Sequence, residues 1–559
     1  MRFTRHLING SRWRGARFAT VARREDYVRR KLAASMRTQL AGIWSVILLL
    51  SLAVMARAQY TYTTNNLGIT ITGYTDSNAV LNIPAAIIPV ALNPSATNAL
   101  PVVSIGSSAF QGNSNLTSVT VPDGVTMIGV SAFSSCTNLT NLTLPDSVTT
   151  IAAGLLQGCV SLTNFTIPPN VTDIGGSAFS GCAALVNITI PNQVANIDNF
   201  AFSSCASLTG ITIPGSVTNL GIQAFSACSH LATVNLFNGL VSLGTGAFSY
   251  CPQLTAISLP DTVIGIPDQA FENCTALASV STGNGVTNIG SDAFFSCDSL
   301  ANVILGNSIF NIGSGAFSGC TALASLTIPA KVANIAHDAF SSCTSLTGIT
   351  LPNSVTNIGN YAFYDCIALT NLSLGTSILN LGTGAFDSCT SLPSVTLPSA
   401  VTNIGSSAFS FCTSLTNINI GSGVTNIGSY AFSSCPSLAA VYFQGNLPAV
   451  GTTVFYDDST NIPVNYLATA SGWGTTFGGE PTTQFTPAVR ILTAGVRSNL
   501  FGFTVTANSD LAIVVEVSTN RNLPAWTPIA TNQLTGGTWY FTDPRWTNSP
   551  ARFYRVRSK

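Results

Sequence analysis

The chain has 559 residues, of which only 8% are charged, and its 21 Lys and Arg residues balance 21 Asp and Glu residues. The charges are unevenly distributed, because 12 of the cations but only two of the acids precede Gln59. From Gln59 to Thr460 the only cation is Lys331, against fifteen acids. An acidic surface repels phosphate backbones, so this charge distribution excludes nucleic acid as a partner.

The first 58 residues have the pattern of a targeting segment. Leu40 to Met55 is an apolar stretch, and Ala56-Arg57-Ala58 is a small-x-small cleavage signal before Gln59. Met36 is the candidate true start, which would make residues 1–35 upstream sequence. We predict an N-terminal extension and signal peptide over residues 1–58, cleaved after Ala58, with an uncleaved membrane anchor as the alternative. Both interpretations place the rest of the chain outside the cytoplasm, secreted or at the cell surface. The mature chain is predicted to have no transmembrane domain.

Residues 59–109 are predicted to form an N-terminal cap for the periodic region that follows them. Gly68-Ile69-Thr70-Ile71-Thr72 and Val80-Leu81-Asn82-Ile83-Pro84 indicate two short strands, because apolar and polar residues alternate in both. A stack of repeats needs such a cap, since its first repeat would otherwise expose an apolar end.

All fourteen cysteines lie 23 residues apart, from Cys136 to Cys435. The repeated unit is C-x-x-L-x-x-[ILV]-x-[ILV]-P-x-x-V-T-x-[IL]-G-x-x-A-F-x-x. Its phenylalanine column runs from Phe110 to Phe455, which is fifteen periods, with Leu156 as the one exception. A fixed period of this length is the signature of a solenoid. We therefore predict about sixteen coils over residues 110–460.

Each coil is predicted to contain one short parallel strand and one tight turn. Paired apolar residues such as Leu142 and Leu144 alternate with polar ones, as a half-buried strand requires. A proline such as Pro145 ends the strand because it has no N–H to donate. A glycine such as Gly175 suits a corner before the A-F-x-x-C segment, which we predict to be a short helical or 3₁₀ turn. Strands on one face and wider turns on the other predict a curved rod.

The repeat resembles the leucine-rich repeat, and specifically its 23-residue BspA-like bacterial surface-antigen type. The L-x-x-[ILV]-x-[ILV] segment, as in Leu139 to Leu144, matches the strand of that family, and Ile174 to Cys182 matches its return segment. The resemblance covers roughly residues 100–460. It implies a solenoid fold and, less specifically, a surface or secreted binding protein.

The C-terminal region departs from the repeat. Residues 461–487 are predicted to form a cap and linker, in which Trp473 and Phe477 cover the last coil and Glu480 to Gln484 joins the next domain. Residues 488–559 hold eight of the nine cations that follow Gln59 and alternate apolar with polar residues. We predict a small all-β sandwich domain there, ending in a strand over residues 552–556.

The cysteines suggest disulfides in an exported protein, but the repeat geometry argues against them. Equivalent residues in stacked strands lie about 4.8 Å apart with parallel side chains, whereas a disulfide needs Cβ atoms about 3.8 Å apart and turned toward each other. We predict a ladder of buried, unpaired thiols.

The sequence offers little for catalysis. Only His230 and His337 follow Gln59, both at variable repeat positions where exposed side chains are expected. No G-x-S-x-G, H-E-x-x-H, Walker or C-x-x-C motif occurs, and adjacent acids such as Asp457 and Asp458 are typical of solvated turns. We predict no enzymatic activity, no metal site and no cofactor.

Two sets of surface residues are candidates for binding. Outward strand positions form columns of hydroxyl and amide side chains, which could serve as a flat, uncharged hydrogen-bonding face: Asn141, Thr143, Asn164, Thr166, Asn187, Thr189 and Thr212. The alternative is that Thr has good β-propensity and that Asn keeps the face wet. On the return segments, four aromatic residues occupy variable positions, where they either anchor an interface or pack between coils: Tyr361, Tyr364, Phe411 and Tyr430.

The functional expectation is an exported, non-enzymatic protein that acts by adhesion or by recognising a protein or glycan surface. The alternative is a structural spacer or matrix protein that presents the C-terminal module. Binding of ice or another crystal by the Thr column is a third interpretation.

Overall fold

The computed structural model describes residues 60–89, 98–459, 461–485, 489–497, 500–507, 511–520, 525–534, 538–548 and 551–558. The predicted signal peptide and its cleavage site lie outside these residues. Among the described residues, no helix has the length and apolar character needed to cross a bilayer.

The N-terminal cap is built from strands that merge with the sheets of the repeats. β1 (Tyr60–Asn65) pairs antiparallel with β2 (Gly68–Tyr74), and β2 pairs parallel with β5 (Leu100–Ile105). β5 also pairs antiparallel with β4 (Ala86–Ile87), and β3 (Val80–Asn82) runs parallel to the first repeat strand. The two predicted strands are therefore present, as β2 and β3. The rings of Tyr60, Tyr74 and Phe110 contact one another in sequence at 5.5 and 5.6 Å in tilted arrangements, which covers the apolar end of the solenoid.

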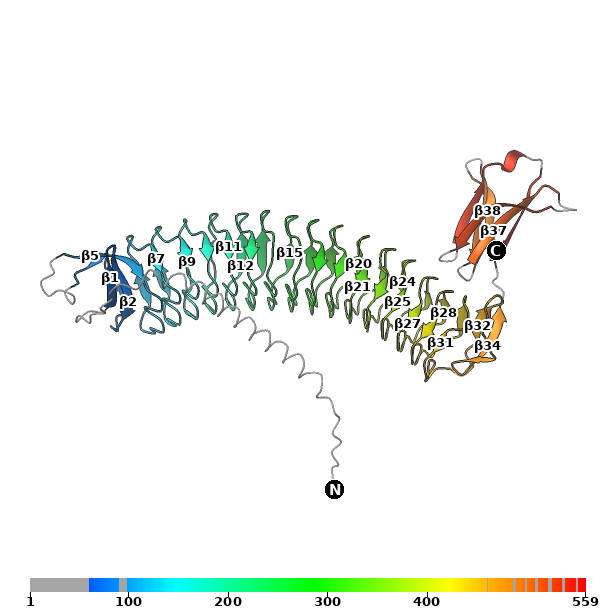
Figure 1. Cartoon of the computed structure of the whole chain (residues 1–559), viewed down its shortest axis with the longest axis horizontal. Coiled ribbons are helices and arrows are strands. Elements are labelled where there is room, and N and C mark those ends of the chain that lie inside the picture. Colours follow the sequence, from blue (N-terminus) through cyan, green and yellow to red (C-terminus); the bar gives the residue numbers. More distant parts are fainter. Residues whose placement is uncertain are drawn as a thin grey trace, which may run out of the picture.

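The coils stack side by side in one curved row between the N-terminal cap and β34, the last strand of the C-terminal cap (Figure 1). Their strands form what we call the first sheet, in which neighbours pair in parallel with a 23-residue offset, for example Ile211 with Val234. The strands are β6 (Ser118–Thr120), β8 (Asn141–Thr143), β12 (Gly210–Ile213), β14 (Thr233–Leu236), β15 (Ala256–Ser258), β16 (Ser279–Ser281), β18 (Asn302–Ile304), β20 (Ser325–Thr327), β22 (Gly348–Thr350), β24 (Asn371–Ser373), β26 (Ser394–Thr396), β28 (Asn417–Ile420) and β30 (Ala440–Phe443).

A second parallel sheet, which the sequence analysis did not predict, is formed by two-residue strands at the x-[IL] positions before the glycine corner. The strands are β7 (Met127–Ile128), β9 (Thr150–Ile151), β10 (Asp173–Ile174), β11 (Asn196–Ile197), β13 (Asn219–Leu220), β17 (Asn288–Ile289), β19 (Asn311–Ile312), β21 (Asn334–Ile335), β23 (Asn357–Ile358), β25 (Asn380–Leu381), β27 (Asn403–Ile404), β29 (Asn426–Ile427) and β31 (Ala449–Val450). In every strand but β31 the second, apolar residue is buried in the core, and in every strand but β7 and β31 the first residue is polar and exposed or half-buried.

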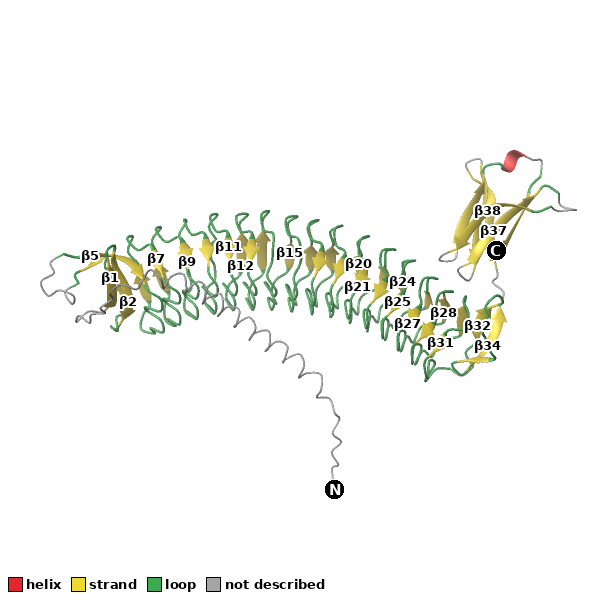
Figure 2. Ribbon diagram, in the orientation of Figure 1, coloured by secondary structure: helices red, strands yellow, loops and turns green. Residues whose placement is uncertain are grey.

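The A-F-x-x-C segments form what we call the turn face, and here the prediction of helical or 3₁₀ turns is wrong. In the described part of the chain the only helix is η1 (Trp546–Asn548), far from the repeats (Figure 2). Along one segment, the N–H groups of Ala132 and Ser134 donate to carbonyls three residues earlier, whereas those of Ser131 and Phe133 donate to the next coil. Left-handed residues such as Ser131, with a φ of 56°, produce this alternation. A helix would use these amides internally and leave the neighbouring coil unpaired.

The core is a set of continuous apolar columns. From Phe179 to Phe340 the rings of consecutive coils stack at 5.0–5.8 Å with interplanar angles of 3–12°. Near-parallel rings are related by translation, so these distances measure the local spacing of the coils. The spacing is somewhat larger than the about 4.8 Å between hydrogen-bonded strands. The rod is curved, as predicted (Figure 1). Leu156 interrupts the column, and its coil supplies Phe165, whose ring meets Phe179 edge-on at 5.1 Å.

The C-terminal cap extends the first sheet with β32 (Val464–Leu467), β34 (Glu480–Phe485) and β33 (Thr476–Phe477). Trp473 stacks on Tyr466 at 5.0 Å and meets Phe443 at 4.8 Å, and Phe477 meets Phe443 at 5.1 Å. Trp473 and Phe477 thus cover the last coil, as predicted. Glu480 to Gln484, predicted as a linker, instead forms most of β34, because the edge of β32 offers unpaired backbone groups to it.

Asp458 makes the stability of this end of the rod dependent on pH. Its carboxylate accepts a hydrogen bond from the N–H of Cys435, and its Oδ2 is buried with no hydrogen bond in the described structure. Burial, with smaller effects from Asp457 and Glu480, raises the pKa of Asp458 to about 6. Since the pKa is higher in the folded state, the folded protein keeps a proton that the unfolded chain loses, and stability falls as the pH rises from about 4 to about 6.

We expect Asp458→Asn to stabilise the protein above pH 6 by about 1 kcal/mol, after allowing for solvent screening, and to have little effect at pH 4. The amide oxygen can still accept from Cys435, and the buried charge is removed. Thermal unfolding of both proteins at pH 4 and pH 7.5 measures the difference. Asp146→Asn, at an exposed turn, is the matched control. A gain that is the same at both pH values would contradict the assignment.

The C-terminal module consists of two three-stranded antiparallel sheets around their own core. One contains β35 (Val489–Arg497), β36 (Leu500–Ala507) and β39 (Thr538–Asp543), and the other β38 (Thr527–Leu534), β37 (Leu511–Ser518) and β40 (Phe553–Ser558). The core residues, separate from those of the solenoid, are Phe503, Val505, Ile513, Val515, Leu534 and Phe541. The all-β sandwich and its final strand were predicted from the sequence.

Candidate binding surfaces

The first sheet presents the predicted hydrogen-bonding face. Residues alternate along each strand, so that Asn141 and Thr143 are exposed while Leu142 between them is buried. All seven predicted residues of this face are exposed: Asn141, Thr143, Asn164, Thr166, Asn187, Thr189 and Thr212. The 23-residue register brings them into neighbouring columns along the N-terminal half of the rod.

The polar groups of this face are only partly used within the protein. Asn141 donates to Ser118 Oγ at 3.3 Å, and Asn235 donates to Thr212 Oγ1 at 3.4 Å, both of them long hydrogen bonds between coils. In the described structure the hydroxyls of Thr143, Thr166 and Thr189 form no hydrogen bond with the protein. Their donors and acceptors are available to a partner.

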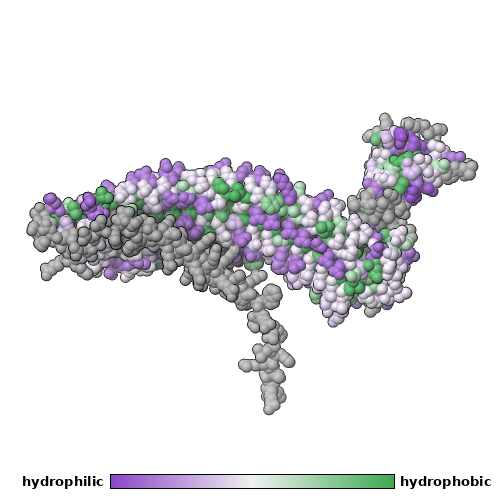
Figure 3. Space-filling model, in the orientation of Figure 1, coloured by the Kyte–Doolittle hydropathy of each residue, from purple (hydrophilic) through white to green (hydrophobic). Residues whose placement is uncertain are grey.

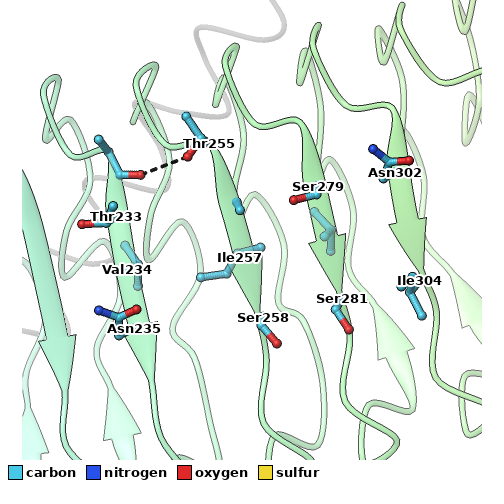
Figure 4. Close-up of a pocket in the computed structure, with 13 residues that line it drawn as sticks. Thr233, Val234, Asn235, Thr255, Ile257, Ser258, Ser279, Ser281, Asn302 and Ile304 are labelled. Carbon is cyan, nitrogen blue, oxygen red and sulfur yellow. Dashed lines mark hydrogen bonds between the residues drawn. The ribbon is translucent and has the colours of Figure 1, made fainter.

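The face has a hollow of about 440 Å³ over β14, β15, β16 and β18 (Figure 4). Its floor is lined by small side chains, where other coils carry Asn and Thr: Ala256, Ser258, Ser279 and Ser281. Asn235 and Ile304 lie at its two ends, and β14 and β15 pair through a single residue pair, Thr233 with Ala256. This site was not predicted from the sequence, although a run of Ala and Ser in consecutive copies of the two columns marks it.

The second sheet carries an asparagine ladder. Seven consecutive coils place Asn at the same exposed or half-buried position, from Asn288 to Asn426. Three of the six neighbouring pairs are joined by an amide hydrogen bond to the preceding coil: Asn311 to Asn288 at 2.7 Å, Asn357 to Asn334 at 3.0 Å and Asn426 to Asn403 at 2.6 Å. Because these bonds join one coil to the next, the three pairs stabilise the stack.

The four predicted aromatic residues lie on the turn face, and three of them belong to two ring pairs. Tyr361 and Tyr364 meet edge to face at 6.0 Å, and Tyr430 meets Tyr456, a residue not singled out from the sequence, at 6.0 Å. Phe411 is 51% exposed and lies in a coil between them. The remaining three predicted residues keep 37–43% of their surface exposed, so packing between coils covers them only in part. Hydrophobic residues on the visible face of the rod occur in scattered patches (Figure 3).

The cysteines lie inside the solenoid. All fourteen are buried and unpaired, as predicted, and each Sγ donates to the carbonyl of the Phe-column residue one coil earlier, as from Cys136 to Phe110 at 3.1 Å. Burial raises the pKa of Cys136 to about 11 and that of Cys343 to about 12. Such thiols stay protonated at neutral pH and are poor nucleophiles. Among the described residues, no group of three or more His, Cys, Asp or Glu side chains is placed to hold a metal ion.

Comparison with known proteins identifies the repeat. Residues 103–462 match, in overlapping segments, the family model for the BspA type leucine rich repeat region (6 copies): 103–232, 149–277, 241–366 and 333–462. A leucine-rich repeat protein from Bacteroides ovatus is 32% identical with a TM-score of 0.57, and the match covers 69% of this chain and 94% of that one. A leucine rich cell surface protein from Faecalibacterium prausnitzii is 31% identical with a TM-score of 0.39, covering 58% and 95%. No curated protein matches the chain.

Proposed function

Since the chain belongs to the BspA-type leucine-rich repeat family, we propose that it is an exported, non-enzymatic binding protein that recognises a protein or glycan surface in adhesion. The observation that carries the proposal is the first-sheet face. It presents uncharged hydroxyl and amide groups at the spacing of the coils, on a rigid scaffold. The apolar stretch and cleavage signal before Gln59 support export.

The face suits recognition of an extended partner. Hydrogen-bond donors and acceptors repeat at every coil, so a long molecule can make many weak contacts along the rod, none of which needs a deep pocket. The hollow over β14 to β18 is the one concave site that we assign to this face, and it has room for a protruding group of the partner. Ile304 at its end adds an apolar contact, since its side chain is 68% exposed.

We expect replacement of Thr143, Thr166, Thr189 and Thr212 together by Ala to weaken partner binding about tenfold or more, because several hydrogen bonds of about 1 kcal/mol are lost. The protein spanning residues 59–559 would be tested on arrays of glycans and of extracellular proteins. A second variant, Ser281→Phe, fills the hollow and is expected to remove those partners that insert into it.

The matched control replaces four exposed threonines beside the second sheet by Ala: Thr172, Thr356, Thr402 and Thr425. Circular dichroism verifies the fold of each variant. Attachment that survives both sets of substitutions would favour the alternative function, a structural spacer that presents the C-terminal module. Equal loss of binding in both sets would show that binding does not depend specifically on the first-sheet face, and would contradict the proposal.

A further inference from the structure

Aromatic and acidic side chains lie together on the turn face, in three neighbouring coils of the C-terminal half of the rod. The ring of His337 lies 5.9 Å from that of Tyr361, and Tyr361 meets Tyr364 at 6.0 Å with an interplanar angle of 85°. Tyr361 is 37% exposed and Tyr364 is 39% exposed. The edge-to-face arrangement leaves a ring face of this pair open to solvent.

Carboxylates surround these rings. Asp338 Oδ2 lies 3.0 Å from His337 Nε2. Asp365 directly follows Tyr364, and Asp387 occupies the position of Tyr364 one coil later, where its carbonyl accepts a hydrogen bond from the N–H of Asp365 at 2.9 Å. Burial, followed by the negative charges of Asp387 and Asp365, raises the pKa of Tyr364. Asp387 accepts a hydrogen bond from Ser388 Oγ at 2.9 Å, which leaves its other oxygen free of side-chain donors in the described structure. We call His337, Asp338, Tyr361, Tyr364, Asp365 and Asp387 the aromatic–acidic patch.

The rings of this patch are not needed for the fold. Other coils have Ser at the position of Tyr361, as at Ser131 and Ser407, and Ser at the position of Tyr364, as at Ser341. Tyr361 also adopts a left-handed backbone, with a φ of 54°, which is unfavourable for a bulky side chain. Its ring lies over Gly384 of the next coil, where any Cβ would collide with it. The fold thus accommodates Tyr361 at a cost and keeps a glycine beneath it.

We propose that the aromatic–acidic patch binds arginine side chains of a basic protein segment. A guanidinium group stacks on a tyrosine face and pairs in bidentate fashion with a carboxylate, and the patch offers both within adjacent coils. Charge complementarity favours such a partner, because Lys331 is the only cation between Gln59 and Thr460, against fifteen acids. The patch lies on a different face from the first sheet. This second binding site goes beyond the proposed function. It rests on that function only in assuming that the protein acts by binding a partner.

The test measures fluorescence anisotropy of labelled peptides with the protein spanning residues 59–559. The probes are a peptide of alternating Arg and Ser, the same peptide with Lys, the same peptide with citrulline, and a neutral β-linked glucan oligosaccharide. The variant Tyr361→Ser/Tyr364→Ser uses the residues that other coils carry, so it is expected to fold. Its matched control is Tyr250→Ser, which removes an exposed tyrosine that bonds to a single acid, Glu272, at 3.3 Å.

We expect the arginine peptide to bind most tightly, the lysine peptide several-fold more weakly and the citrulline peptide not at all. The double tyrosine variant should lose about tenfold in affinity, and Tyr250→Ser should lose none. Asp365→Asn/Asp387→Asn should weaken binding more than Asp123→Asn/Asp146→Asn, which makes the same change in net charge at exposed turns. Equal binding to all variants, binding of citrulline as well as arginine, or binding of the glucan in place of the peptide would each overturn the proposal. These variants leave Thr143, Thr166, Thr189 and Thr212 unchanged. Binding through the first sheet can therefore fail or succeed independently of binding through the aromatic–acidic patch.

Discussion

Phe294→Ala is expected to destabilise the solenoid by about 3–5 kcal/mol, the largest effect of any single substitution considered for this protein. Phe294 is fully buried, and its ring stacks between Phe271 at 5.4 Å and Phe317 at 5.2 Å. Removing it opens a cavity in the middle of a continuous column, and the neighbouring coils cannot close that cavity without breaking their own register. Urea unfolding followed by circular dichroism measures the loss.

Hydrogen exchange should also locate the cavity along the rod. Each coil contacts only its neighbours, so the damage is expected to be local and to raise hydrogen exchange in the coils around residues 271–317 before the ends of the rod. Phe294→Leu is the control, because Leu156 occupies the same column naturally. It should cost about 1 kcal/mol. Equal losses for Ala and Leu would contradict a cavity mechanism.

All fourteen thiols are expected to be unreactive in the folded protein and fully reactive once it is unfolded. Each thiol is buried, and Cys182, whose pKa burial raises to about 12, has almost no thiolate at pH 8. Treating the non-reduced protein with iodoacetamide at pH 8 should add no tags under native conditions. In denaturant it should add fourteen, one for each cysteine, as counted by mass spectrometry.

Two comparisons make the labelling decisive. Adding a reductant before denaturation should leave the count unchanged, because no cysteine is paired. Phe294→Ala should expose nearby Cys297 to slow labelling, because local opening then becomes more frequent. A count well below fourteen in denaturant without reductant would mean that the ladder is cross-linked.

The buried part of the fold could be predicted from the sequence because the repeat is strict. Each coil packs against neighbours with the same sequence pattern. Equivalent residues therefore pack against each other, in the columns Phe110 to Phe455 and Cys136 to Cys435. The same reasoning gave the number of coils, the outward position of Asn141 and Thr143, and the unpaired thiols. The covering of the last coil by Trp473 and Phe477 was predicted separately, from aromatic residues that follow the end of the repeat. Spacing and side-chain size determine these features, and both are written in the sequence.

The features that only the tertiary structure decided depend on hydrogen bonds between neighbouring coils and on the surface that adjacent side chains form together. The A-F-x-x-C segment was predicted to be a helical or 3₁₀ turn, but alternate amides such as those of Ser131 and Phe133 bond to the next coil, which forces left-handed residues and excludes a helix. Glu480 to Gln484 has the composition of a linker, yet the free edge of β32 recruits it as a strand. The hollow at Ala256 and Ser281, and the position of Asp387 beside Asp365 of the preceding coil, exist only once adjacent coils are side by side. A linear pattern fixes which residues are buried, whereas the partners of exposed groups are set by the coil next to them.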